Sequence, residues 1–275
     1  MWYLNLAISS FFYLLIAPFK NLDPLWSLMV MSLLVGILML VIFRYTSNQE
    51  AIRKTKNKIR AYIFELRLFK DELGIVLSAQ KKIFSYNMKY MSYALKPMLF
   101  MIVPLALILI QLEGWYGFKA LTPEESAVVS LKLSDGNQEV INGITMTASP
   151  GLEIDSPALR IQSEKEVNWR IRAKEFGSHS LTFNVDNYSF NREVIVSEKG
   201  LKRITPASFR SELWNFLLNP GQKAIPDNPY VEEIDVSYPL NSIKVYKWGL
   251  HWLVVLFVLS IVFGFALKGL FKVEI

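Results

Sequence analysis

The sequence predicts an α-helical membrane protein with three transmembrane helices, a cytoplasmic helical hairpin and an all-β domain inserted before the last span. Three observations predict this class. Of the 275 residues, 52% are hydrophobic while 20% are charged, a balance typical of membrane segments combined with aqueous parts. Long apolar runs flank a strongly basic segment. Farther along the chain, short β-like runs alternate with turn residues.

Three apolar runs, residues 25–43, 97–116 and 249–267, are each close to the length that crosses about 30 Å of hydrocarbon. Aromatic residues close the second run, as expected at a membrane interface. Residues 1–20 are also apolar, but they lack the basic start and the small-residue cleavage site of a signal peptide. We expect a helix lying in the interface there, with a fourth span as the alternative.

The distribution of lysine and arginine predicts the orientation. Residues 44–96 carry twelve basic side chains against four acidic ones, whereas residues 111–247 carry fifteen against eighteen. Basic loops stay in the cytoplasm, so the N-terminus is expected outside and both the hairpin and the C-terminus inside a plasma (inner) membrane. The net charge of +6 is then mainly a topology signal, which argues against nucleic-acid binding.

Residues 44–96 predict two antiparallel, coiled-coil-like helices. Ser47 and Glu50 have the spacing of a capping box, and Gly74 offers a turn. Apolar residues recur at helical spacings in both arms: Ile52, Ile59, Ile63 and Leu66, then Leu77, Phe84, Met88, Met91 and Leu95.

Two prolines are expected to break the helix that leaves the hairpin. Pro97 should end the cytoplasmic helix and restart the chain, because proline is best tolerated in a first helical turn. Pro104 lies deeper and should kink the second span.

Seven of the nine methionines lie in the first span, the second arm of the hairpin or the second span. For any one of them, ordinary helix packing is the simpler interpretation. The alternative is a flexible thioether surface that adapts to unlike apolar clients. That client-binding surface would comprise Met88, Met91, Met98, Met101, Met29 and Met31.

With its interfacial helix, inward first span, basic hairpin and "LKPMLFMIVPLALIL" at the second span, the chain resembles the YidC/Oxa/Get/EMC superfamily of membrane-protein insertases. It is most similar to the small archaeal YidC-like members with a three-span core. The resemblance covers residues 1–118 and 249–275. It implies a groove, open to lipid and cytosol, in which the polar part of a client segment crosses the bilayer.

The groove arginine of the bacterial insertases has no counterpart within the first span. Polar candidates for the groove are therefore few, and each alone is more simply a helix-contact or interface residue. They are Ser27, Ser32, Gln111, Ser260 and Arg44, with His251 at a membrane edge.

The inserted residues 122–198 predict six or seven strands, including "SAVVSLKL", "QEVINGITMTA" and "EVNWRIRAKE". With Trp169 between strand residues, the segment looks like an immunoglobulin-like sandwich by analogy of fold. Residues 203–247 are expected to form an amphipathic helix from about Ala207 to Leu218 and one or two further strands.

No catalytic motif, metal site or cofactor site is expected, so the protein is not predicted to be an enzyme. One predicted function is a YidC-like insertase or membrane chaperone, whose partners are membrane lipid, nascent client proteins and a ribosome or translocon at the basic hairpin. The alternative is a non-inserting scaffold or accessory subunit that binds an extracytoplasmic partner through the sandwich and another through the hairpin.

Overall fold

The chain folds into a helical part and a β-rich part, in agreement with the predicted combination of helices with an inserted β-domain. The computed structural model describes residues 2–135, 138–210 and 224–274. Two compact units follow from the contacts within it. Unit 1 comprises Met1–Ser27 and Leu109–Trp252, and unit 2 comprises Leu28–Ile108 and Leu253–Ile275.

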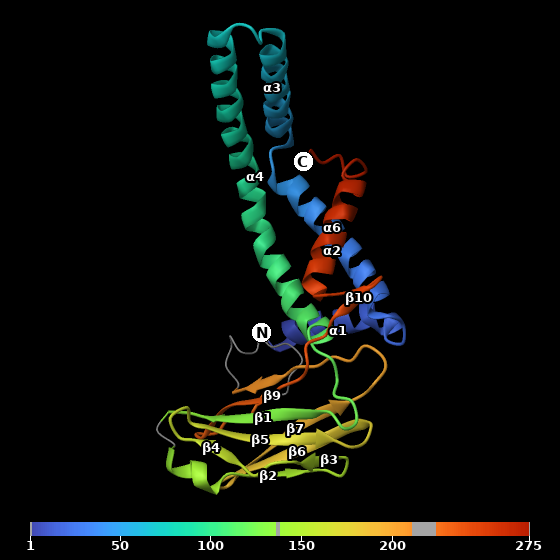
Figure 1. Cartoon of the computed structure of the whole chain (residues 1–275), viewed down its shortest axis with the longest axis vertical. Helices are drawn as coiled ribbons and strands as arrows, with labels where there is room; N and C mark the ends of the chain where they lie inside the picture. Colours follow the sequence, from blue (N-terminus) through green and yellow to red (C-terminus); the bar gives the residue numbers. More distant parts are fainter. Residues whose placement is uncertain (1, 136–137, 211–223, 275) are drawn as a thin grey trace. The chain divides into compact units, whose positions relative to one another are not determined.

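Helices dominate the first 116 residues and return near the end of the chain (Figure 1). Two of them, α2 (Pro24–Thr46) and α4 (Leu73–Tyr116), are long and apolar enough to cross a membrane. The other helices are α1 (Trp2–Ile16), the 3₁₀ turn η1 (Ala17–Phe19), α3 (Gln49–Leu68) and α6 (Trp252–Leu267).

The last helix, α6, is shorter than the predicted span of residues 249–267. It begins at Trp252 and contains 16 residues. The chain just before it pairs as a hairpin of β10 (Ile243–Val245) and β11 (Trp248–Leu250), so the residues at 249 and 250 belong to a strand.

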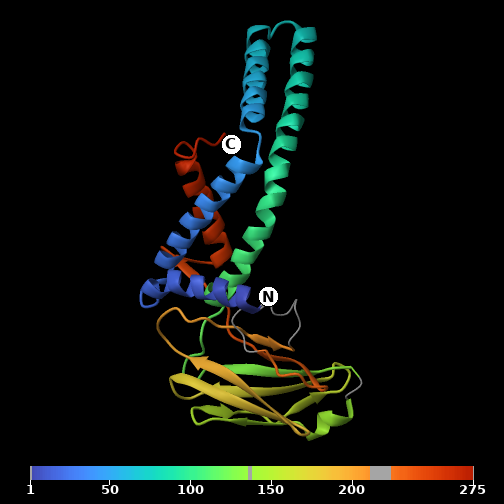
Figure 2. The same cartoon turned by 180° about the vertical axis from the view of Figure 1, so that it is seen from behind.

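Helices α3 and the first part of α4 form the predicted antiparallel hairpin, and they run side by side in both views (Figures 1 and 2). The predicted cap at Ser47 is wrong. Asn48 is the N-cap, because its side-chain oxygen accepts a hydrogen bond from the Ala51 N–H at 3.0 Å. The Ser47 hydroxyl instead donates to the Phe43 carbonyl at 2.6 Å. The turn precedes Gly74, which already lies inside α4.

The arms of the hairpin meet in part through aromatic rings. Of the predicted apolar stripe on α3, Ile52 is buried and Ile63 is exposed. Tyr62 and Tyr86 stack with their ring centroids 5.5 Å apart. Lys82 lies 5.1 Å above the Tyr62 ring and Lys58 lies 5.5 Å above the Tyr86 ring. Such cation–π pairs suit a partly exposed contact, because the ammonium group is attracted to the face of the ring and also covers it. The hydrogen bond from Lys58 lowers the pKa of Tyr86.

The prediction that Pro97 ends the cytoplasmic helix is wrong, because α4 is one helix of 44 residues that contains both Pro97 and Pro104. The kink expected at Pro104 stays a prediction. At 1.5 Å per residue the length of α4 is about 66 Å. Each proline removes a single N–H donor, and the helix continues on both sides of it. Pro97 is itself buried.

The β-rich part of unit 1 is a sandwich of two antiparallel sheets (Figures 1 and 2). The larger sheet has the strand order β3-β5-β1-β9-β8, with β4 also paired to β5, and the smaller has the order β2-β6-β7. The strands are β1 (Ser126–Leu133), β2 (Thr145–Ala148), β3 (Leu152–Ile154), β4 (Leu159–Ile161), β5 (Glu166–Ala173), β6 (Gly177–Val185), β7 (Tyr188–Val196), β8 (Ala207–Phe209) and β9 (Val231–Val236).

Three details of the sandwich depart from the sequence prediction. The run "QEVINGITMTA" was predicted as one strand, but its first half is a 3₁₀ helix, η2 (Gln138–Gly143), and its second half is β2. The sandwich does not end at residue 198, because β8 and β9 complete the larger sheet. The helix predicted from Ala207 is wrong at its start, where β8 pairs with β9; the rest of that segment, 211–223, lies outside the described residues.

The core lies between the two sheets. Alternate residues of β1 and β5 point inward, as the period of a half-buried strand requires. Trp169 of β5 is 4% exposed and meets Phe183 of β6 edge-on, with the ring centroids 5.7 Å apart. This contact joins the two sheets and confirms that Trp169 is buried.

A buried arginine ties the two sheets together at one edge. Arg192 on β7 donates hydrogen bonds to the Ser208 hydroxyl and to the carbonyls of Thr205 and Pro206. Burial lowers the pKa of Arg192. Burial likewise raises the pKa of Asp235 on β9, an effect that the charge of Arg192 partly offsets.

We expect Trp169→Ala to destabilise the sandwich by about 3 to 5 kcal/mol, since it removes a core aromatic ring and leaves a cavity. Hydrogen exchange of peptides from β5 and β6 in the full-length protein will measure the loss. The matched control is Arg170→Ala on the exposed face of the same strand, which should change the opening free energy little. Equal protection in the two variants would place the core elsewhere.

Candidate functional site: an apolar groove among three helices

Unit 2 contains a groove of about 410 Å³ lined by residues of α2, α4 and α6. The lining side chains are almost all aliphatic, thioether or aromatic. The lining includes Gly36 and Met39 of α2, Met98 and Met101 of α4, and Ser260 and Gly264 of α6.

The groove offers almost no polar chemistry. No charged side chain is among its described lining residues. Ser260 supplies the one hydroxyl, which already donates to the Phe257 carbonyl at 3.0 Å within the same helix. Contact with an occupant would therefore rest on shape and on the removal of apolar surface from water or lipid.

Two glycines give the groove its shape. A Cβ atom added to Gly36 would lie 3.0 Å from the Ser260 carbonyl oxygen, so α2 and α6 approach closely at this point. A Cβ atom added to Gly264 would meet no atom within 4 Å, so open space remains there. One glycine therefore permits helix contact, whereas the other leaves room inside the groove.

The methionines predicted as a client-binding surface separate into three groups. Met98 and Met101 line the groove. Met88 and Met91 lie on the hairpin, where they are 45% and 59% exposed. In the first span, Met31 is buried and Met29 is half-buried, and neither lines the groove.

Met39 lines the groove without having been predicted. It lies on α2 with Met29 and Met31, and the sequence alone does not show which of these methionines faces the other helices of the groove. Gly36 and Gly264 were also missed, because a glycine inside an apolar run gives no sign of which helix it faces.

Of the polar residues predicted for the groove, only Ser260 lines it. Ser32 is buried, with its hydroxyl bonded to the Leu28 carbonyl at 2.7 Å, and Arg44 is exposed in the last turn of α2. Ser27 belongs to unit 1, where its hydroxyl accepts a hydrogen bond from the Tyr116 hydroxyl at 2.8 Å.

Gln111 belongs to a separate polar cluster of unit 1. Its side-chain oxygen accepts hydrogen bonds from Arg203 at 3.1 Å and from the Ser9 hydroxyl at 3.3 Å. Arg203 also contacts the Ser9 oxygen at 3.4 Å. Burial lowers the pKa of Arg203. The cluster joins α1, the end of α4 and the segment between β7 and β8, so Gln111 has a structural role in this arrangement.

The hairpin presents an apolar stripe that the neighbouring helix does not cover. Five side chains on α4 are between 45% and 66% exposed: Leu77, Phe84, Met88, Met91 and Leu95. Four lysines and no acidic residue lie on the same stretch, residues 73–96. The stripe continues along α4 to Met98 in the groove.

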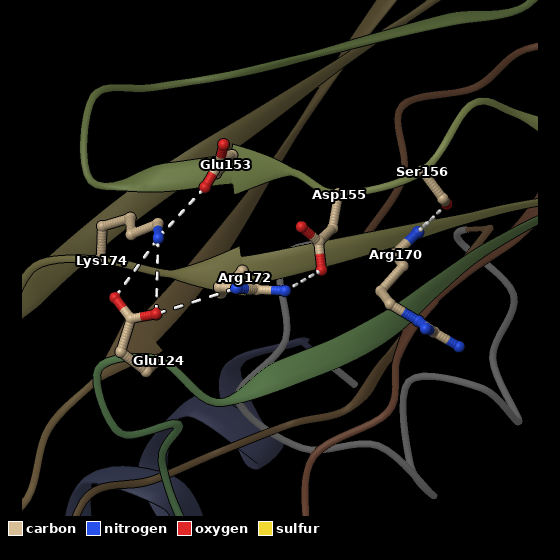
Figure 3. Close-up of polar contacts among 7 residues, drawn as sticks. All are labelled: Glu124, Glu153, Asp155, Ser156, Arg170, Arg172 and Lys174. Atoms are coloured by element: carbon tan, nitrogen blue, oxygen red, sulfur yellow. Dashed lines mark hydrogen bonds and ion pairs between the residues drawn. The ribbon is translucent and has the colours of Figure 1, made fainter.

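The sandwich carries a charged network on the outer face of β5 (Figure 3). Arg172 donates to the Asp155 carboxylate at 2.6 Å, and Lys174 lies 3.3 Å from Glu124 and 3.2 Å from Glu153. These partners raise the pKa values of Arg172 and Lys174, the hydrogen bonds to Asp155 and Glu153 being the largest causes. Because the charges satisfy one another at the surface, the network holds β3 against β5 and contributes little stability.

No protein-family model matches the sequence, and no curated protein sequence matches it. Among the described residues, no group of three or more histidine, aspartate or glutamate side chains is arranged to hold a metal ion.

We expect Gly36→Val to destabilise the helices of unit 2 by about 1 to 3 kcal/mol, because the new side chain must push α6 away. Gly264→Val is the matched control and should cost less, since its Cβ atom meets open space. Unfolding of the full-length protein in mixed micelles, followed by the loss of helical circular dichroism, will compare them. Equal losses would show that Gly36 is not a helix contact.

Proposed function

We propose that the protein is a YidC-like membrane chaperone that receives apolar client segments in the groove of unit 2. In this proposal α2, residues 97–116 of α4, and α6 cross the plasma membrane. The hairpin and the C-terminus lie in the cytoplasm, and the immunoglobulin-like sandwich lies outside. The observation that carries the proposal is a preformed apolar groove lined by methionines from a helix that continues into a basic hairpin.

The lengths of the helices support a membrane function. At 1.5 Å per residue, the 23 residues of α2 extend about 35 Å, enough for a bilayer core of about 30 Å. The 16 residues of α6 extend about 24 Å. A helix shorter than the hydrocarbon thickness is accommodated by local thinning of the bilayer. Thinning beside the groove would shorten the path of a client segment.

The chemistry of the groove favours holding an apolar helix over conducting a polar one. Pockets of about 300 to 1,000 Å³ accept compact ligands, so this groove has room for a few side chains of one helix. Flexible thioethers at Met39, Met98 and Met101 can adapt to side chains of different shape. The lack of a charged lining residue separates this groove from the arginine-containing one that the family resemblance implies.

The exposed stripe of the hairpin provides a route toward the groove. Its apolar side chains lie on α4, the helix that also supplies Met98 and Met101. The lysines beside the stripe suit an acidic or nucleic-acid partner such as a ribosome, because opposite charges speed encounter. A client segment could thus meet the hairpin first and slide along a single helix.

Topology is the first test. The chain has no cysteine, so single cysteines can be introduced at two exposed positions, Gln162 after β4 and Asn57 on α3. A membrane-impermeant maleimide should label Gln162→Cys on intact cells and Asn57→Cys only after the membrane is opened. Labelling of both positions on intact cells, or the reverse order, would exclude the proposed arrangement.

Client capture is the second test. A photocrosslinking amino acid is placed at Met101 in the groove or, as a control of similar depth, at Leu99, which is 61% exposed and does not line the groove. A single-span test protein with a weakly apolar helix is then synthesised in vitro with vesicles that contain the variant. We expect crosslinking at least about fivefold stronger from Met101, which corresponds to about 1 kcal/mol of preference.

A blocked groove supplies the matched control. Gly264→Leu should fill the open space without disturbing the helices, and it should reduce crosslinking from Met101 to the level of Leu99. Equal crosslinking from both positions, unaffected by Gly264→Leu, would reject the client groove. A single constant partner crosslinked in place of the test protein would favour the scaffold function.

A further inference from the structure

A second pocket, of about 540 Å³, lies in unit 1 beside the segments that enter and leave the sandwich. Unlike the groove, it combines polar and apolar walls. Lys119, Lys202 and Lys244 line it together with Trp115, Leu22 and Leu240.

Main-chain hydrogen bonds hold the walls of this pocket in place. The segment after α4 pairs with the segment after β9: Lys119 N–H donates to the Pro239 carbonyl at 3.0 Å, and Asn241 N–H to the Gly117 carbonyl at 2.9 Å. The segment after β7 is bonded at both ends, from Leu201 N–H to the Lys20 carbonyl at 2.9 Å and from Ile204 N–H to the Gly114 carbonyl at 2.7 Å. The pocket is therefore preformed, which lowers the entropy cost of binding.

The charges at the pocket favour an anion. Three lysines line it, and Glu198 is the acidic residue among the described lining residues. Lys119 also pairs with Glu125 at 3.5 Å, whereas Lys202 and Lys244 are exposed at the mouth. With Glu125 paired to Lys119, the two remaining lysines face one lining carboxylate, Glu198, so the pocket keeps a small excess of positive charge.

Trp115 provides an independent indication of a bound acceptor. Its side chain is only 2% exposed, and its indole N–H has no hydrogen-bond partner within residues 2–135, 138–210 and 224–274. A buried donor without an acceptor is costly, and tryptophan N–H groups normally find a partner. Trp115 is itself a lining residue of the pocket, so a ligand bound there is the candidate acceptor for its N–H.

The pocket also has apolar lining residues, two of which are exposed. Leu22 and Leu240 line it and are 52% and 70% exposed. On the β10–β11 hairpin that directly precedes α6, Tyr246 and Trp248 are 89% and 71% exposed. Exposed aromatic residues beside the start of a span are typical of the headgroup level of a bilayer.

We propose that this pocket binds the phosphodiester headgroup of an anionic phospholipid from the outer leaflet. Lys202 and Lys244 neutralise the phosphate, the Trp115 N–H donates to an oxygen of the headgroup, and Leu22 and Leu240 contact the glycerol and the start of the acyl chains. The proposal uses the membrane topology of the proposed function and does not depend on client capture.

The test measures lipid binding to the full-length protein in a nonionic detergent. Dioleoyl phosphatidylglycerol is titrated, and the bound fraction is read by native mass spectrometry. We expect saturable binding that dioleoyl phosphatidylcholine does not reproduce. The double variant Lys202→Gln/Lys244→Gln should bind at least about tenfold more weakly, since each lysine near an anionic lipid contributes about 1 kcal/mol.

Two further variants separate a built site from diffuse attraction. Lys199→Gln/Lys247→Gln removes the same charge from exposed positions outside the pocket and should weaken binding less than about twofold. Trp115→Phe keeps a ring but removes the N–H, and it should weaken binding about fivefold. Equal losses in the two lysine pairs, or no loss in Trp115→Phe, would overturn the proposal.

Inorganic phosphate distinguishes a lipid from a free anion. At millimolar concentration it should not displace dioleoyl phosphatidylglycerol, because it lacks the glycerol and acyl groups that Leu22 and Leu240 contact. Full displacement by inorganic phosphate would identify a phosphate-ion site and overturn the lipid proposal.

Discussion

Main-chain hydrogen bonds among the segments that connect helices to strands are the constraint on which unit 1 depends. Three such segments lie around residues 117–121, 197–204 and 239–241, and each is bonded to another or to the end of a helix. These segments are neither helix nor strand. The hydrogen bonds therefore hold residues that belong to no helix or sheet. The placement of Arg203 against Gln111, the burial of Trp115 and the shape of the lysine-lined pocket all follow from them.

The groove of unit 2 depends on a different balance, between close helix approach and space left open. Small residues allow helix backbones to approach in a membrane, where apolar attraction between helices is weak. Gly36 provides that approach, and Gly264 leaves its space unfilled. In the proposed function, an uncharged groove of this kind would lower the energy of an apolar client helix, whereas a charged groove would suit a polar segment. The two proposed sites thus differ in chemistry: the groove in unit 2 offers apolar contacts, and the pocket in unit 1 offers an ionic contact.

Sequence reasoning succeeded where a period directly reports burial, and it failed where tertiary context decides. The alternation of "SAVVSLKL" gave β1 with its observed bounds, and the position of Trp169 in β5 correctly indicated a core residue. The run "QEVINGITMTA" was predicted as one strand, yet its first half is the 3₁₀ helix η2 and only its second half is β2. Pro97 was expected to end a helix, but α4 continues through it, because packing and the hydrogen bonds on either side outweigh the loss of one donor. The groove was predicted through Met98 and Met101, while Gly36, Gly264 and the lysine-lined pocket join residues far apart in sequence and leave no local pattern.

Proline chemistry gives α4 a mechanical property beyond its length. Pro97 and Pro104 cannot donate to the carbonyls of Tyr93 and Phe100, so two rungs of the hydrogen-bond ladder are absent by covalent structure. At these two places the helix can change its bend without breaking a main-chain hydrogen bond, so the prolines divide α4 into three segments. Met98 and Met101 lie on the short segment between Pro97 and Pro104. A small rotation of that segment would move both thioethers together. In the proposed function, this would adjust the width of the groove to the client segment.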